Sequence, residues 1–238
     1  MRLSIVIPVY NEVRTLEELL SQVFAIDTGL DRQVILVDDG STDGTLELYP
    51  KIQDRWPNED IVVHLQPVNK GKGAALREGF KRTTGDIVLI QDADLEYHPR
   101  DYPRLLQPIL DGRADVVYGS RFVGGQDHRV HLFWHMVGNK FLTAFSNMFT
   151  NLTLTDMETC YKVSRAEVLE GITLKANRFN IEPEITARIA RKNAHGRRWR
   201  IFEVGISYAG RDYEEGKKIT WRDGVSALWT IVKCRFSG

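Results

Sequence analysis

Short runs of β-branched and apolar residues alternate along the chain with segments of helical periodicity. The helical segments, such as residues 16–23 and 102–109, place apolar side chains at positions i, i+3, i+4 and i+7. This alternation predicts an α/β fold, in which helices cover both faces of a mostly parallel sheet. Ligands then bind beyond the carboxyl ends of the strands, so polar clusters are expected directly after them. The predicted strands are residues 3–9, 33–38, 61–66, 87–91 and 116–119.

Neither a signal peptide nor a membrane span is predicted. The apolar run at residues 3–9 is short, and Asn11 and Glu12 follow it instead of a small-residue cleavage site. The segment closest to a membrane span, residues 132–154, is interrupted by polar residues that include His135 and Lys140. The chain is therefore not expected to cross a membrane, which leaves contact with a membrane surface open.

The composition is that of a globular domain. The 238 residues are 42% hydrophobic and 27% charged, which excludes disordered and fibrous classes. The 32 basic and 32 acidic side chains cancel, and this balance argues against a nucleic-acid binder, which needs a basic excess. Two cysteines, Cys160 and Cys234, are too few for a disulfide framework, and no His/Cys cluster indicates a zinc site.

Two adjacent carboxylates, Asp38 and Asp39, follow the second predicted strand. They would repel each other unless the hydroxyl or amide groups of a ligand use them, so a ligand site is favoured. The alternative is a tight turn in which Ser41 or Thr42 caps the next helix. No GxGxxG or GxxxxGK[ST] sequence is present, which argues against nicotinamide dehydrogenases and P-loop NTPases.

Three carboxylates, Asp92, Asp94 and Glu96, follow the fourth predicted strand. On an extended segment, residues at i, i+2 and i+4 lie on one face, so these side chains are expected to converge at the edge of the sheet. A Mg²⁺ or Mn²⁺ ion would offset their repulsion and leave coordination positions open for substrate phosphates. A solvated acidic turn is the alternative.

Phosphates on such a metal need positive charges opposite. Arg121 directly follows the fifth predicted strand, and Arg211 and Lys217 lie in a later segment that mixes glycine and charge. For each of these cations, a surface salt bridge or a solvated hairpin tip is an equally good interpretation. A glycine-rich turn at residues 69–75 opens another helix and could hold an anion at the helix N-terminus.

These motifs together resemble the inverting glycosyltransferases of family 2, and among them the dolichyl-phosphate and polyprenyl-phosphate sugar synthases. The resemblance implies one GT-A catalytic domain over residues 1–238. Residues 1–122 would bind the nucleotide sugar, and residues 123–238 would lie next to the acceptor and the membrane. The matching strings are Val6-Ile-Pro-Val-Tyr-Asn-Glu12, Val37-Asp-Asp-Gly-Ser-Thr-Asp43, Asn69-Lys-Gly-Lys-Gly-Ala-Ala75, Gln91-Asp-Ala-Asp-Leu-Glu96 and Gly119-Ser-Arg-Phe122.

The resemblance also assigns roles to individual residues. Asp92 and Asp94 look like the metal-binding DxD pair, with Glu96 as a further candidate ligand. Asp94, Arg211 and Lys217 are the implied catalytic residues, and the two cations would contact phosphate groups of donor or acceptor. The implied nucleotide-sugar pocket comprises Pro8, Tyr10, Glu12, Val37, Asp39, Lys72, Asp92, Ala93, Asp94 and Arg121.

The implied reaction is inverting transfer of a sugar from a donor of the GDP-mannose or UDP-glucose type to a polyprenyl phosphate. The acceptor phosphate is already ionised near pH 7, so no general base is required. A hydroxyl acceptor on a glycan is the alternative, and it would need a base such as Asp156 or Glu158. A non-catalytic sugar-nucleotide-binding subunit is a further alternative. A nucleotidyltransferase is disfavoured, because its phosphate loop should follow the first strand.

An aromatic and methionine-rich stripe at residues 133–149 suggests contact with a membrane. Phe133, Phe141 and Phe145 fall on a broad face of a predicted helix, which suits a lipid-facing surface. Such a stripe is more often core or a dimer surface, and this alternative is preferred on pattern alone. A peripheral protein on the cytoplasmic face of a membrane, alone or with a membrane-anchored partner, is the resulting expectation.

Overall fold

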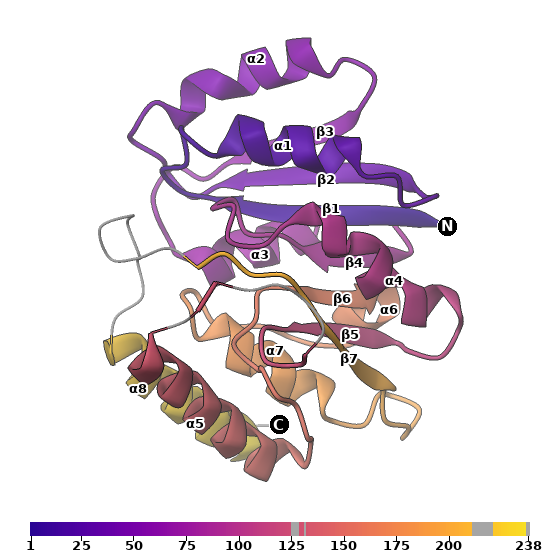
Figure 1. Ribbon diagram of the computed structural model, residues 1–238, viewed down its shortest axis with the longest axis vertical. Coiled ribbons are helices and arrows are strands. Elements are labelled where there is room, and N and C mark those ends of the chain that lie inside the picture. The colour runs from indigo at the N-terminus through magenta and orange to yellow at the C-terminus, as the bar shows by residue number, and fades with distance from the viewer. Residues whose placement is uncertain (125–128, 131, 211–220, 237–238) are drawn as a thin grey trace.

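A single sheet organises the protein. The computed structural model describes residues 1–124, 129–130, 132–210 and 221–236. Within these residues the sheet has seven strands in the order β3-β2-β1-β4-β6-β5-β7 (Figure 1). The strands are β1 (Arg2–Val9), β2 (Asp31–Asp38), β3 (Asp60–Leu65), β4 (Ile87–Ile90), β5 (Val116–Ser120), β6 (Lys162–Arg165) and β7 (Ile201–Gly205).

The sheet is mostly parallel, as expected. Strand β1 pairs in parallel with β2 and β4, and β5 pairs in parallel with β7. Strand β6 is the antiparallel member, and it lies between β4 and β5. The five strands predicted from sequence are confirmed with small shifts at their ends, whereas β6 and β7 were not predicted.

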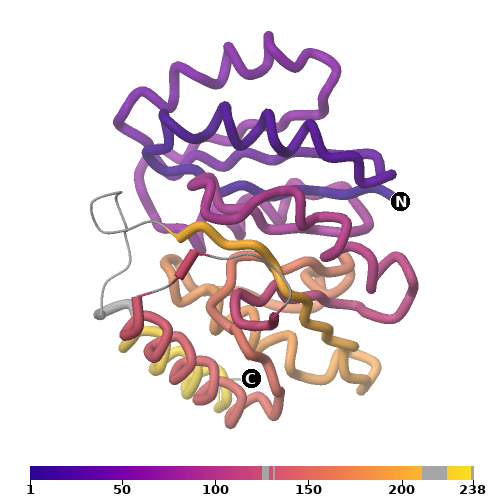
Figure 2. The backbone as a smooth tube through the Cα atoms, viewed as in Figure 1, coloured from indigo at the N-terminus to yellow at the C-terminus, as the bar shows by residue number. Residues whose placement is uncertain are grey.

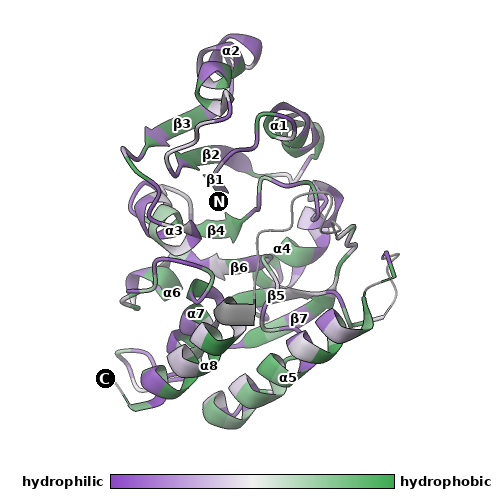
Figure 3. Cartoon of the chain, turned by 90° about the vertical axis from the view of Figure 1, so that its left-hand side faces the viewer, coloured by the Kyte–Doolittle hydropathy of each residue, from purple (hydrophilic) through white to green (hydrophobic). Residues whose placement is uncertain are grey.

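Helices cover both faces of the sheet, which confirms the second expectation of the α/β pattern. Helices α1 (Leu16–Ala25) and α4 (Tyr102–Leu110) lie on one face, and α3 (Lys72–Phe80), α6 (Ala166–Glu170) and α7 (Ile181–Ile189) lie on the other (Figure 3). Helix α2 (Leu48–Arg55) lies at the β3 edge (Figure 1). Two short 3₁₀ helices, η1 (Thr45–Glu47) and η2 (Pro99–Asp101), connect these elements.

Helices α5 (Phe133–Thr150) and α8 (Trp221–Phe236) form a separate pair. They lie side by side and pack against α7 at the end of the molecule farthest from α2 (Figures 1 and 2). Only Thr143 and Ser146 of α5 are buried. Among the described residues, no helix combines the length and the apolar character needed to cross a membrane.

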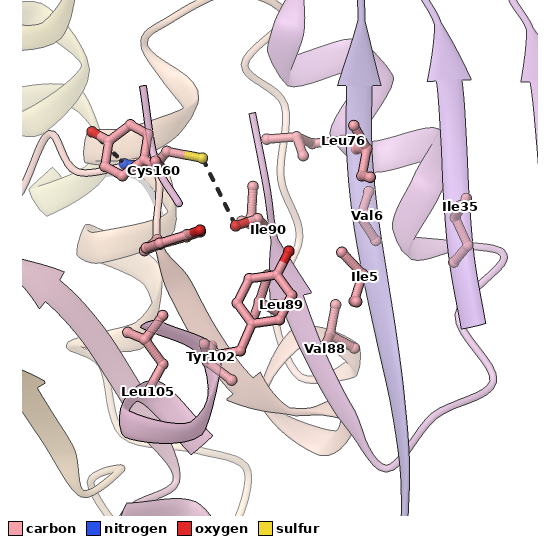
Figure 4. Close-up of a cluster of buried hydrophobic side chains, with 14 of the residues drawn as sticks. Ile5, Val6, Ile35, Leu76, Val88, Leu89, Ile90, Tyr102, Leu105 and Cys160 are labelled. Atoms are coloured by element: carbon pink, nitrogen blue, oxygen red, sulfur yellow. Dashed lines mark hydrogen bonds between the residues drawn. The ribbon is translucent and has the colours of Figure 1, made fainter. Parts of the chain in front are cut away.

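The core lies between the sheet and its helices. Ile5, Val6 and Ile35 are fully buried, because parallel strands covered on both faces have no solvent side (Figure 4). This is why these strands appear in the sequence as continuous apolar runs. Helix α3 approaches β1 closely at Gly79, where an added Cβ would overlap the side chain of Val6.

Candidate functional site

The site begins at Asp92, which directly follows Gln91 at the end of β4. Its carboxylate forms an ion pair with the ammonium of Lys72, at 2.7 Å from Oδ1, and accepts a hydrogen bond from it at Oδ2. Lys72 is the first residue of α3, so α3 brings a cation to the carboxyl end of β4. The family resemblance implied that Lys72 and Asp92 lie in one pocket, and the structure brings them into contact.

The Lys72 ammonium also contacts Glu182, near the start of α7, at 3.0 Å. Glu182 in turn pairs with Lys162 of β6, whose ammonium also donates to the Thr159 carbonyl. Burial alone would lower the pKa of Lys72, but the carboxylates of Asp92 and Glu182 raise it well above its ordinary value. Two cations and two carboxylates therefore form a compact, partly buried network at the carboxyl end of β4.

The segment that carries the acidic triplet is turned rather than extended. Leu95 adopts φ +62°, and residues 93–97 form turns and bends. The expectation that Asp92, Asp94 and Glu96 share one face of an extended segment is therefore wrong. The Glu96 amide donates to Asp94, and the Glu96 carboxylate accepts a hydrogen bond from the Tyr208 hydroxyl at 2.7 Å.

Gln91 holds this turned segment in place. Its amide group donates to the carbonyls of Asp92 and Tyr97, and its side-chain oxygen accepts hydrogen bonds from the hydroxyls of Tyr102 and Tyr161. Gln91 is fully buried, and its bonds with Tyr97, Tyr102 and Tyr161 lie away from solvent. The backbone that carries Asp92 and Asp94 is fixed by a side chain that sequence analysis had included only as part of a motif.

The Asp92 and Asp94 carboxylates fit a divalent metal in their donor chemistry. Both are hard oxygen donors of the kind that Mg²⁺ and Mn²⁺ prefer, and Asp92 already binds the Lys72 ammonium, so this position attracts a cation. No three His, Cys, Asp or Glu side chains are grouped to hold a metal in the part of the chain that the structure describes. Asp92, Asp94 and Glu96 are therefore not grouped to hold a metal by themselves.

The paired carboxylates Asp38 and Asp39 are satisfied by the chain itself. Asp38 accepts hydrogen bonds from the Ser41 amide and the Tyr49 hydroxyl. Asp39 accepts from the amides of Lys70 and Gly71 and from the Gln66 side chain, at 2.7–3.0 Å. Burial raises the pKa of Asp39, although its two backbone hydrogen bonds oppose that rise. Hydrogen bonds within the chain thus offset the repulsion between Asp38 and Asp39, and contact of Asp39 with a nucleotide sugar stays a prediction.

The glycine-rich turn packs against the chain. A Cβ at Gly71 would lie 2.5 Å from the Asn177 carbonyl oxygen, and one at Gly73 would lie 2.5 Å from the Ala176 carbonyl oxygen. Gly71 also adopts φ +97°, which disfavours other residues. The amide of Ala74 donates to Asn177 as well. The glycines thus serve close packing against residues 176–178, and this packing places Lys72 beside Glu182.

Arg121 is paired internally. Its guanidinium forms two hydrogen bonds with the buried carboxylate of Asp156, both at 2.7 Å, and its amide donates to the same carboxylate. The guanidinium also lies over the ring of Tyr208, 5.2 Å from its centroid. Asp156 therefore balances the charge of Arg121 without any ligand.

Glu158 differs from Asp156 in having an unsatisfied oxygen. Its buried Oε1 has no hydrogen-bond partner among the described residues. Burial, with the negative charge of Glu182, raises the pKa of Glu158 to about 7, although Lys162 and Arg121 oppose that rise. Of the two bases expected for a hydroxyl acceptor, Glu158 is thus the one with the capacity to exchange a proton near neutral pH.

The remaining predicted pocket residues lie around the end of β1 and β2. The side chain of Val37 is fully buried in the core, so only its backbone can reach a ligand, and Ala93 is almost as deeply buried. The Glu12 carboxylate accepts a hydrogen bond from Thr15 and its carbonyl accepts from the first turn of α1. Pro8 and Tyr10 are partly exposed at the same edge. Arg211 and Lys217 lie outside the described residues.

Comparison with known proteins identifies the family. The model of glycosyl transferase family 2 matches residues 4–173, which is most of the chain and includes Asp39, Lys72, Asp92 and Asp94. The chain belongs to glycosyltransferase family 2.

Relatives with assigned names agree with this membership. A dolichol-phosphate mannosyltransferase of Pyrococcus furiosus is 30% identical over 91% of this chain. An undecaprenyl-phosphate 4-deoxy-4-formamido-L-arabinose transferase of Photorhabdus laumondii is 28% identical over 98% of it. This family 2 chain spans 59% of the length of the first relative and 67% of the second.

A solved structure with the same fold confirms the GT-A fold. Glucosyl-3-phosphoglycerate synthase of Mycobacterium tuberculosis, crystallised with Mn²⁺, UDP and phosphoglyceric acid, superposes with a TM-score of 0.71. The match covers 99% of this chain and 79% of the neighbour, at 20% identity.

Three site residues of this family 2 chain were missed from its sequence. Glu182 and Lys162 complete the network around Lys72, and Tyr208 holds Glu96. Glu182 precedes a proline in the first turn of α7, where an acidic residue is ordinary, so it gave no distinct signal. Lys162 lies in a short strand whose ends are polar.

Proposed function

We propose that the protein transfers a sugar, with inversion, from a nucleoside diphosphate sugar of the GDP-mannose or UDP-glucose type to a polyprenyl phosphate at a membrane surface. Both named relatives carry polyprenyl-phosphate sugar transfer in their names. The M. tuberculosis neighbour, which has the same fold, was crystallised with phosphoglyceric acid, a water-soluble compound. The fold alone therefore does not identify the acceptor, and we use the surface of this chain to choose between a lipid and a soluble compound.

The observation that carries the lipid acceptor is an exposed apolar face on α5 and α8, which we call the α5/α8 face. Trp134 is 77% exposed and Trp229 is 67% exposed, although both are large and apolar. Single exposed apolar residues are common, but here they recur along two helices that pack against each other, which supports an interaction surface. The face comprises Phe133, Trp134, Val137, Phe141, Met148, Val225, Trp229 and Phe236.

This exposure excludes one of the two alternatives that the sequence left open, a core helix, and the dimer surface is the other. The core interpretation of the stripe is wrong for Phe133, Phe141 and Met148, which are all more than half exposed. A polyprenyl chain leaves a bilayer at a cost of about 0.8 kcal/mol for each CH₂ group, so the enzyme must come to the lipid. We assign the α5/α8 face to this contact, on the cytoplasmic side of the membrane, either alone or beside a membrane-anchored partner.

The donor side rests on the Asp92 and Lys72 network. Asp92 and Asp94 would hold a Mg²⁺ or Mn²⁺ ion, which would neutralise charge on the leaving nucleoside diphosphate. When a cation occupies Asp92, Lys72 becomes available to contact donor phosphates while Glu182 holds its ammonium in place. Arg211 and Lys217 are proposed to contact the reacting phosphates. The acceptor phosphate is itself the nucleophile, so the chain supplies no base.

A hydroxyl acceptor is a second candidate, and Glu158 favours it. A carboxyl group with a pKa of about 7 and an unpaired buried oxygen has the properties of a general base at neutral pH. Asp156 cannot take this role while it holds Arg121 through two hydrogen bonds. Glu158→Gln therefore separates the two functions: transfer to a phosphate survives it, and transfer to a hydroxyl is lost.

A donor panel tests the proposal. Radiolabelled GDP-mannose and UDP-glucose are each incubated with a short polyprenyl phosphate and Mn²⁺, and the labelled lipid product is measured. We expect product from one donor, and a loss of about 100-fold or more in Asp94→Asn, because one charged metal ligand becomes an amide. Glu170→Gln, at an exposed carboxylate on α6, is the matched control. Equal transfer by Asp94→Asn and the unaltered protein would contradict the DxD assignment.

A further inference from the structure

A cavity of about 320 Å³ lies away from the candidate site. Strand β7 runs parallel to β5. The first residue of β7 therefore lies at the amino ends of the parallel strands, whereas Asp92 and Asp39 lie beyond their carboxyl ends. Trp199, two residues before β7, lines the cavity together with Arg188 in the last turn of α7. The Lys72 and Glu182 network is at the other end of α7. The cavity is therefore separate from the donor site.

The walls of this cavity carry positive charge. Lys175, Arg188, Arg191 and Lys192 all line it, and none of the residues that line it is acidic. Outside the lining, Glu184 pairs with one of these cations, its Oε1 lying 3.9 Å from Arg188 Nη2. Glu184 already accepts hydrogen bonds from the amides of Lys175 and Ala176 at 2.8 and 2.6 Å, so it balances only part of the charge.

Arg188 is the decisive residue. Its side chain is only 10% exposed, and its buried Nε has no hydrogen-bond partner among the described residues. A buried guanidinium N–H without a partner costs free energy, and a small rotation of the side chain that brings Nε to an acceptor oxygen in the cavity would remove this cost. Guanidinium groups bind phosphate and carboxylate oxygens through paired N–H donors, whereas an ammonium acts as a point charge.

The cavity is also connected to the C-terminal helix. The Arg191 guanidinium donates to the carbonyl of Cys234 in the last turn of α8. Trp199 adds a partly buried aromatic wall, which packs against the main core. The cavity thus has an aromatic side, formed by Trp199, and a cationic side.

We propose that this basic cavity, formed by Arg188, Arg191, Lys192, Lys175 and Trp199, is a second anion site that binds a phosphate group. The shared chemistry is a phosphate oxyanion held by Arg188 and Lys192 beside the Trp199 ring. The phosphate can belong to a soluble compound or to the headgroup of an anionic lipid next to α8. The proposal is independent of the donor, the acceptor and the metal of the catalytic reaction.

The test uses the indole N–H signal of Trp199 in ¹H–¹⁵N spectra of the whole chain. The chain has five tryptophans, and Trp199→Phe assigns the signal of interest. Inorganic phosphate is titrated in the presence of EDTA, so that no metal-bound phosphate forms at Asp92. We expect a saturable shift of the Trp199 signal, with an affinity about tenfold weaker in Arg188→Gln, which corresponds to 1.4 kcal/mol.

Two further variants, both at exposed residues, show whether a loss of binding comes from the cavity and not from misfolding. Lys192→Gln changes an exposed residue of the cavity and should weaken phosphate binding, whereas Lys51→Gln, at an exposed residue of α2, should leave it unchanged. A second arm compares sedimentation with phosphatidylglycerol and phosphatidylcholine vesicles. Loss of phosphatidylglycerol binding in Lys192→Gln would assign the phosphate to a lipid headgroup, and a shift with inorganic phosphate alone would assign it to a soluble compound.

Either of these results supports the anion site. The proposal is overturned if inorganic phosphate leaves the Trp199 signal unchanged and both cavity variants bind phosphatidylglycerol vesicles as well as the Lys51→Gln control does. It is also overturned if all three variants weaken binding equally, because the effect would then come from net charge.

Discussion

At the residue scale, Lys72 stabilises the fold by neutralising two carboxylates, and its ammonium lies where a metal cation would bind. Its ammonium balances both Asp92 and Glu182, so Lys72→Gln leaves two partly buried carboxylates with less positive charge. We expect the variant to be destabilised by about 2 kcal/mol without metal and to gain more in melting temperature from Mn²⁺ than the unaltered protein does. Thermal unfolding with EDTA and with Mn²⁺ measures both effects.

The control for this prediction is Lys70→Gln, because Lys70 is exposed and its side chain is outside the network. A Mn²⁺ response in Lys72→Gln no larger than in Lys70→Gln would mean that Lys72 does not occupy a cation position.

A second residue-scale prediction concerns Glu158 and the pH dependence of stability. Its pKa is raised from 4.5 to about 7, so the folded protein holds this proton more tightly than the unfolded chain does. The associated stability is complete below pH 4.5 and is lost as the pH rises toward 7. Glu158→Gln removes this dependence, and its advantage over the unaltered protein should grow across that window to about 3 kcal/mol, at about 1.4 kcal/mol per pH unit.

Urea unfolding at several pH values between 4.5 and 8 measures the difference. Glu170→Gln, at an exposed carboxylate, should show no such trend. A constant offset between Glu158→Gln and the unaltered protein would show that Glu158 titrates at an ordinary pKa.

At the scale of elements, the glycine-rich turn before and within α3 sets the position of Lys72. A Cβ at Gly73 would meet the Ala176 carbonyl oxygen at 2.5 Å, and backbone cannot yield as a flexible side chain does. Gly73→Ala should therefore lower the free energy of unfolding by about 1–3 kcal/mol, the typical cost of overpacking. Chemical denaturation provides the measurement.

Gly138→Ala in α5 is the matched control, because nothing lies within 4 Å of its added Cβ. This change should be neutral or should stabilise the helix by about 0.4–1 kcal/mol. If both variants lose the same stability, contact with residues 176–178 is not the reason for the glycine.

The α5/α8 face makes the other prediction at this scale. Phe141→Ser combined with Trp229→Ser should greatly reduce sedimentation with vesicles and leave the melting temperature nearly unchanged, because both side chains are more than half exposed. Leu46→Ser, at an exposed apolar residue of η1, is the control. A collapse of the melting temperature in the double variant would mean that the face is internal to an assembly, such as a dimer.

The sequence predicted strands best where both faces of the strand are buried. Strands β1, β2 and β4 are covered on both faces, so their continuous apolar runs were clear. Strand β6 was missed because it is four residues long and its Lys162 is buried through pairing with Glu182, twenty residues further along. The sequence could not predict that α5 is exposed, because an apolar helical face has the same pattern in a core helix and in a surface helix.

At the scale of the whole molecule, one sheet carries three separate features. The candidate donor site lies at the carboxyl ends of the parallel strands, the α5/α8 face lies at one end of the molecule, and the basic cavity lies near the start of β7. The sequence placed Asp92 and Asp94 correctly after β4, because polar clusters follow strands in this fold. It could not show that Lys72 and Glu182 meet, since 110 residues separate them and only the packing of α3 on residues 176–178 joins them.

The central claim is that the acceptor is a lipid phosphate, and one comparison tests it most directly. The protein is given its preferred donor, Mn²⁺ and vesicles that contain either a polyprenyl phosphate or the free polyprenol of the same length, and labelled sugar in the lipid phase is counted. We predict product with the phosphate alone, retained in Glu158→Gln, because the ionised phosphate needs no base. Transfer to the free polyprenol that disappears in Glu158→Gln would contradict the claim and establish a hydroxyl acceptor.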